Sequence, residues 1–120
     1  MTLALVYLAA AFFAGMGLVA LLQPERVLFF FGIRQLGRDG RNEVRAVYGG
    51  FGLAVAVLLL GTLSFFAPLR DGILFTVAVA LLGMAAGRLV SVASDGNPGR
   101  YPWIFFGVEL VLAGMLFRAI

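Results

Sequence analysis

The sequence contains no cysteine and no histidine, and all nine of its basic residues are arginine. The absence of thiols and imidazoles excludes disulfides, Cys/His zinc or iron–sulfur sites, and a histidine-based catalytic triad. It also removes the side chain that usually titrates near neutral pH. We therefore expect neither a metal site nor a cofactor.

Charged residues are scarce as well. They make up 12% of the 120 residues, whereas 62% are hydrophobic and the mean hydropathy is +1.05. A soluble domain carries about 25% charged residues, so this chain has too little polar surface to coat a water-soluble globule. We expect the lipid bilayer to surround it. The arginines form no dense cluster on a polar segment, which argues against nucleic-acid binding, and a GC-rich genome is a plain explanation for their number.

Four long apolar stretches predict transmembrane helices, because about twenty residues cross about 30 Å of hydrocarbon. Pro24 ends the first stretch, and Asn42 and Asp71 are suitable caps for the second and third. The links are short enough for neighbouring helices to run antiparallel. We predict one all-α integral membrane domain over residues 1–120, an antiparallel four-helix transmembrane bundle with spans at about 2–22, 42–66, 72–94 and 102–117.

The segment "VLFFFGI" between the first two spans is too short to cross a bilayer. We expect a short interfacial or re-entrant helix there, with nearby arginines in the headgroup layer: Arg34, Arg38 and Arg41. Loops one and three together hold five arginines, whereas the opposite side holds Arg70 and Arg118. The positive-inside rule then predicts a multi-pass protein of the inner (cytoplasmic) membrane with loops one and three in the cytoplasm.

Charged residues inside the spans form the candidate ligand-binding site. Tyr48, Arg88 and Glu109 are all expected about 9–10 Å below the same surface, with Glu43 and Arg45 just above them. Charges at such a depth usually turn inward and pair. We therefore predict an Arg88–Glu109 ion pair between spans three and four.

Three more features complete this polar layer. Ser91 and Asp95 share a helix face with Arg88, at i+3 and i+7. Arg45 is expected to share Glu109 or to reach Asp95. The layer is open to two interpretations, since ion pairs, including Arg45 with Glu43, can fix helix register without any chemistry, whereas intramembrane charges usually mark functional sites.

Glycines suggest where helices approach closely. Gly49, Gly52 and Ala56 form one stripe with Arg45 on span two, against which a neighbouring helix or a ligand can lie. The "GMAAG" sequence, residues 83–87, is a Gly-x-x-x-Gly motif. We expect it to pack within the bundle, and the alternative is a contact between protomers in a homo-oligomer.

Three stretches, "EVRAVYGG", "GRLVSVASDGNP" and "VEL", resemble the small bacterial membrane proteins of domain-of-unknown-function family 4345. The matching residues are Glu43, Arg45, Tyr48, Gly49, Gly50, Gly87, Arg88, Asp95, Gly96, Pro98 and Glu109. The resemblance covers nearly the whole chain. It implies four transmembrane helices and a shared polar site, but no reaction.

Binding or transfer of a small amphipathic or lipid-like anionic ligand is the function we favour, because arginines below a headgroup surface suit a phosphate or carboxylate. The aromatic "VLFFFGI" and "YPWIFF" would flank its apolar part. One alternative is an accessory or structural subunit that docks on itself or on another membrane protein. The other is an intramembrane isomerase or lipid-modifying enzyme using Glu109 or Asp95, which we favour less because no nucleophile or metal-ligand set accompanies them.

Overall fold

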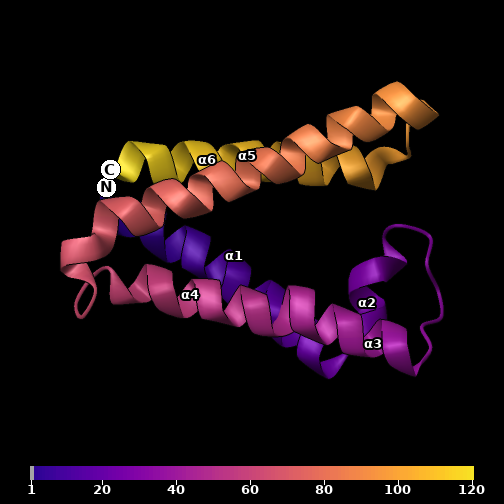
Figure 1. Ribbon diagram of the computed structural model, residues 1–120, viewed down its shortest axis with the longest axis horizontal. Coiled ribbons are helices and arrows are strands. Elements are labelled where there is room, and N and C mark those ends of the chain that lie inside the picture. Colours follow the sequence, from indigo (N-terminus) through magenta and orange to yellow (C-terminus); the bar gives the residue numbers. More distant parts are fainter. Residues whose placement is uncertain (1) are drawn as a thin grey trace.

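The computed structural model describes residues 2–120, which form helices joined by turns and contain no strand (Figure 1). The predicted all-α fold with four long apolar helices is confirmed. The four segments long and apolar enough to cross a membrane are Thr2–Leu22, Arg38–Gly61, Ala67–Asp95 and Arg100–Ala119.

The first helix, α1 (Thr2–Leu22), has no charged residue and is followed by Gln23 and Pro24. Proline at the first position of the next helix then starts α2 (Pro24–Phe29), since a missing N–H costs nothing there. A short helix is thus present between the first two spans, as predicted, but it covers residues 24–29, whereas the prediction placed it on "VLFFFGI", residues 27–33, of which 30–32 form turns. An irregular segment over residues 33–37 leads on to the second long helix.

That second long helix is made of α3 (Arg38–Val44), the π-helical turn η1 (Arg45–Gly50) and α4 (Phe51–Gly61). It begins four residues before Asn42, so Asn42 lies inside α3 and is not the predicted cap. It also ends at Gly61 rather than near residue 66, because residues 62–66 form turns. The buried Thr62 hydroxyl donates to the Leu59 carbonyl at 2.6 Å, which satisfies it at this helix end.

A 3-10 turn, η2 (Ala67–Leu69), precedes α5 (Arg70–Asp95). Asp71 makes no capping hydrogen bond and lies in the first turn, where the helix dipole favours a negative charge. Gly96 ends α5 with φ at +90°, a conformation that glycine adopts at no steric cost. A short loop then leads into α6 (Arg100–Ala119), which begins two residues before the expected Pro102.

The long helices pack as two pairs, α1 with α4 and α5 with α6, and α1 also contacts α6. The pairs lie close together at the end that holds both termini and diverge toward the end that holds α2, α3 and the α5–α6 loop (Figure 1). The largest fully buried side chains are mostly near the closed end: Val6, Leu59, Thr62, Leu74, Leu81 and Leu116. Loops one and three lie together at the divergent end, as an antiparallel chain requires.

Glycine brings α1 and the second long helix into close contact. A Cβ added to Gly17 would lie 2.9 Å from both the Gly49 carbonyl oxygen and the Leu53 nitrogen, and one on Gly52 would lie 3.1 Å from the Phe13 carbonyl oxygen. The predicted stripe on span two therefore faces a helix. The prediction for "GMAAG" is wrong, because a Cβ at Gly83 or Gly87 would meet no atom of the chain within 4 Å.

Candidate functional site

The predicted ion pair between α5 and α6 is confirmed. The Arg88 Nε atom donates to Glu109 Oε1 at 3.0 Å and to Oε2 at 2.9 Å, and Nη2 donates to Oε1 at 2.7 Å. Glu109 is 4% exposed, whereas the Arg88 side chain is 26% exposed. Charge-assisted hydrogen bonds of this kind are about twice as strong as neutral ones, so the pair fastens the two helices together inside the apolar span.

A pocket of about 940 Å³ lies beside this pair, where the two helix pairs diverge. Its walls come from α1, α2 and the residues after it, η1, α5 and α6. Most of its lining is apolar, including Phe12, Phe13, Met16, Val19, Phe29, Phe30, Phe31, Leu81, Met84, Phe105 and Val108. Its polar members are Glu25, Arg26, Arg34, Tyr48, Arg88 and Glu109.

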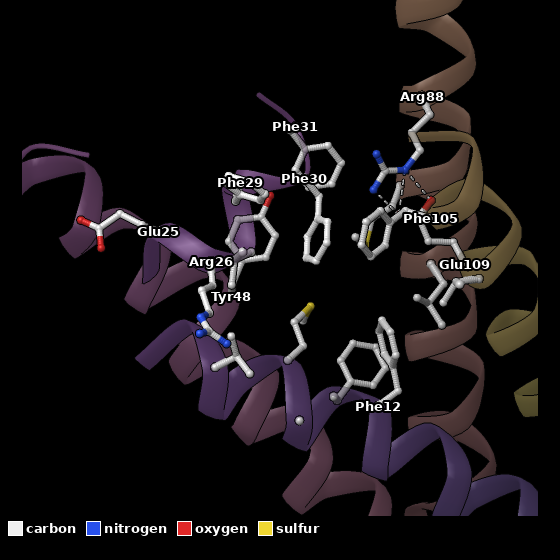
Figure 2. Close-up of a pocket in the computed structure, with 18 of the residues that line it drawn as sticks. Phe12, Glu25, Arg26, Phe29, Phe30, Phe31, Tyr48, Arg88, Phe105 and Glu109 are labelled. Atoms are coloured by element: carbon white, nitrogen blue, oxygen red, sulfur yellow. Dashed lines mark hydrogen bonds and ion pairs between the residues drawn. The ribbon is translucent and has the colours of Figure 1, made fainter. Parts of the chain in front are cut away.

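Aromatic rings close the pocket at the loop end. The Phe31 and Phe105 ring centroids are 5.2 Å apart, and the Arg88 guanidinium carbon lies 5.8 Å from each of them. Phe30 adds a contact with Tyr101 at 5.0 Å. Figure 2 shows Phe30 and Phe31 standing over the cavity next to Arg88. The segment after α2 thus bridges the divergent helix pairs.

Tyr48 and Arg26 lie across the cavity from Arg88 and Glu109 (Figure 2). The π-helical turn η1 carries Tyr48 into the pocket wall while its neighbour Gly49 is buried against α1. Such turns occur frequently at functional sites. The Tyr48 hydroxyl has no hydrogen-bond partner among residues 2–120, and it is therefore free to donate or accept.

The pocket's positive charge is only partly neutralised. Glu109 is taken up by Arg88, and Glu25 points away from the cavity toward Arg41, whose Nη1 lies 3.3 Å from Glu25 Oε1. Within residues 2–120, Arg26 and Arg34 form no ion pair. Two exposed guanidinium groups without a carboxylate partner therefore line a mostly apolar pocket.

The structure brings together three of the seven residues predicted for the site, namely Tyr48, Arg88 and Glu109. The other four, Glu43, Arg45, Ser91 and Asp95, are exposed and do not line the pocket.

The prediction that Arg45 reaches Glu109 or Asp95 is wrong, and Arg45 does not pair with Glu43. Its Nε instead donates to the Leu21 carbonyl at 2.9 Å, because carbonyls in the last turn of α1 lack helical partners and attract a cation.

Sequence reasoning missed Arg26 and Arg34 as pocket residues. Both flank the aromatic segment at residues 27–33, for which we predicted an interfacial or re-entrant helix, and a re-entrant segment places its flanking residues close to the bundle. Periodicity does not give the path of such a segment, so only its flanking position could have indicated them.

The arrangement offers binding groups more than catalytic ones. Among residues 2–120, no three His, Cys, Asp or Glu side chains gather where they could hold a metal ion. A general base must reach a substrate proton, but both Glu109 oxygens already accept hydrogen bonds from Arg88. The remaining polar groups are an unpartnered hydroxyl and two guanidinium groups, which recognise anions.

The comparisons with known proteins find one match, to a protein family. No curated protein and no solved structure matches the chain. A family described as a domain of unknown function, DUF4345, matches residues 1–120, the whole chain. The protein therefore belongs to the DUF4345 family.

Proposed function

We propose that this protein binds or transfers a small amphipathic or lipid-like anionic ligand in the pocket between its helix pairs. It would do so as a multi-pass protein of the inner membrane, with loops one and three in the cytoplasm. The observation that carries the proposal is the presence of Arg26 and Arg34, without carboxylate partners within residues 2–120, on a mostly apolar pocket.

The size and lining of the pocket support a ligand of this kind. Small-molecule sites usually measure about 300–1,000 Å³ and combine apolar walls with a few polar groups, and this one measures about 940 Å³. Guanidinium groups bind phosphate and carboxylate through paired hydrogen bonds. Tyr48 adds a hydroxyl on the same side of the cavity as Arg26, so this side offers polar contacts, and the mostly apolar remainder of the lining would hold an apolar body.

Native mass spectrometry in mild detergent tests the proposal with two lipids that share one acyl chain. Oleoyl-lysophosphatidic acid presents an anionic phosphate, whereas oleoyl-lysophosphatidylcholine masks it with choline. We expect a one-to-one adduct that favours the anionic lipid several-fold. The variant Arg26→Gln/Arg34→Gln should lose this preference because the unpaired charges are gone.

The matched control is Arg38→Gln/Arg100→Gln. It removes the same charge from the same end of the molecule, but at exposed residues that do not line the pocket. It should keep the wild-type preference. If both variants lose the preference equally, the arginines act only through net charge, and a wild type that binds both lipids alike contradicts the proposal directly.

A second candidate function, an accessory subunit that docks on itself or on another membrane protein, is favoured by the outward-facing Gly83 and Gly87 of α5. Small residues let two helices approach closely in a membrane. Because the chain has no cysteine, Gly83→Cys introduces a single thiol. A disulfide-linked dimer from Gly83→Cys, but not from Gly114→Cys on α6, would support homo-oligomerisation through this face.

A further inference from the structure

The pocket extends well below the loop surface. Gly15 of α1 and Met84 of α5 both line it. Gly15 lies seven residues before Leu22 and Met84 eleven before Asp95, which places them about 10 and 16 Å from those helix ends. In helices that cross about 30 Å of hydrocarbon, these positions are at the depth of the acyl chains.

Pocket-lining residues of both α1 and α5 remain exposed at this depth. α1 packs against α4, η1 and α6, but not extensively against α5, and the helix pairs diverge here (Figure 1). Ala11, Gly15 and Val19, at successive turns of α1, are exposed and line the pocket, and Met84 on α5, which also lines it, is 46% exposed. We call the opening bordered by these four residues the lateral seam.

The seam is apolar on both edges. α1 contains no charged residue, and on α5 none occurs between Asp71 and Arg88. A hydrated ion or a water-soluble metabolite gains nothing from such an edge, whereas an acyl chain passes it without desolvation cost. The two arginines without a carboxylate partner, Arg26 and Arg34, lie at the loop end of the pocket, on the segment around α2.

We propose that the ligand is a membrane-resident anionic lipid that enters sideways through the lateral seam. Its acyl chain lies between α1 and α5 while its phosphate or carboxylate head meets Arg26 and Arg34. This inference rests on the proposed function and names its substrate class. The anionic lipids of the cytoplasmic leaflet would be at the right level, if the arginine-rich end faces the cytoplasm.

Photolabelling in phosphatidylcholine nanodiscs tests the route. The probe is palmitic acid with a diazirine in mid-chain, and its attachment sites are mapped by digestion and mass spectrometry. We expect labels concentrated on residues 11–19 of α1 and around Met84. Unlabelled oleate should compete for these sites, whereas hexanoate, a soluble carboxylate with the same head, should not.

Gly15→Phe fills the seam, and Gly114→Phe is its matched control. Both glycines are helical and exposed, and a Cβ on either meets no atom within 4 Å, but only Gly15 lines the pocket. We expect Gly15→Phe to reduce labelling at the pocket several-fold and Gly114→Phe to leave it unchanged.

The outcomes separate the two proposals. If Arg26→Gln/Arg34→Gln abolishes labelling at the pocket but Gly15→Phe does not, or if hexanoate competes as well as oleate, the ligand enters from the loop side. The lateral route is then wrong while the binding function stands. If labels spread evenly over all lipid-facing helices and no variant changes them, both proposals fail.

Discussion

Replacing the two members of the Arg88–Glu109 pair, singly and together, should give unequal and non-additive losses of stability. Arg88→Met leaves a carboxylate that is 4% exposed without the three hydrogen bonds it accepts. Removing one partner of a buried pair costs about 3–5 kcal/mol. The opposite change, Glu109→Leu, should cost less, about 1–3 kcal/mol. Arg88 is 26% exposed and keeps the Phe31 and Phe105 rings beside its guanidinium group.

The double variant Arg88→Met/Glu109→Leu removes both charges and fills the space with apolar atoms. Exchanging a buried ion pair for hydrophobic side chains is often neutral or stabilising. We therefore expect the double variant to be more stable than Arg88→Met alone, which requires a favourable coupling between the two sites that exceeds the cost of Glu109→Leu, about 1–3 kcal/mol.

The assay is reversible unfolding in mixed micelles with increasing dodecyl sulfate. Trp103, the single tryptophan, lies on the same helix as Glu109 and provides a fluorescence signal. Circular dichroism gives an independent transition. Two results would refute this reasoning: a double variant whose loss of stability equals the sum of the two single losses, or a larger loss for Glu109→Leu than for Arg88→Met. Either would mean that Glu109 is not a buried carboxylate that depends on Arg88.

Three further changes probe the frame around the site with the same unfolding assay. Gly17→Ala should destabilise by about 1–3 kcal/mol because its Cβ would lie 2.9 Å from backbone atoms of η1 and α4. Its control, Gly15→Ala, has no atom within 4 Å of the added Cβ and should stabilise by about 0.5–1 kcal/mol. Equal effects of the two changes on stability would contradict close packing of α1 against α4. Arg45→Gln should lower the stability by about 0.5–1.5 kcal/mol and speed amide hydrogen exchange in the last turn of α1, because it removes the hydrogen bond to the Leu21 carbonyl. Unchanged exchange in that turn would refute a capping role for Arg45. Gly96→Ala should cost about 1–3 kcal/mol because φ is +90°, whereas Gly99→Ala, at φ −67°, should be nearly neutral.

The fold could be predicted from the sequence because hydrocarbon thickness and apolar length together determine where helices form. Helix ends were less predictable. α3 begins at Arg38 rather than Asn42 because the chain after α2 enters the helix through Gly37, and a charged first turn costs little outside the hydrocarbon. The pairing of α1 with α4 follows from Gly17, Gly49 and Gly52, but the same kind of signal at Gly83 and Gly87 misled. A pair of glycines on one helix face indicates that another helix can pack closely there, but it does not identify that helix.

The candidate site was predictable where depth alone decides a contact. Arg88 and Glu109 lie on adjacent antiparallel helices at equal depth, so their pairing followed from counting residues. Arg45 lies just above this layer, and its guanidinium group donates to the Leu21 carbonyl of α1 instead of pairing with a carboxylate. Arg26 and Arg34 could not be placed, because they belong to a segment whose path is set by Phe30 and Phe31 packing on Tyr101 and Phe105.

The structural and the functional interpretation of the polar layer are compatible once its charges are assigned to separate tasks. Arg88 has its charge matched by Glu109 and cannot supply net attraction for an anion, so the pair serves to hold the wall on which Phe31 and Phe105 rest. In the proposed function, the attraction for an anion would come from Arg26 and Arg34, which lie between the first two long helices and form no ion pair within residues 2–120. Loss of the pair should therefore appear first as lost stability, and loss of the two free arginines as lost binding in a protein that unfolds like the wild type.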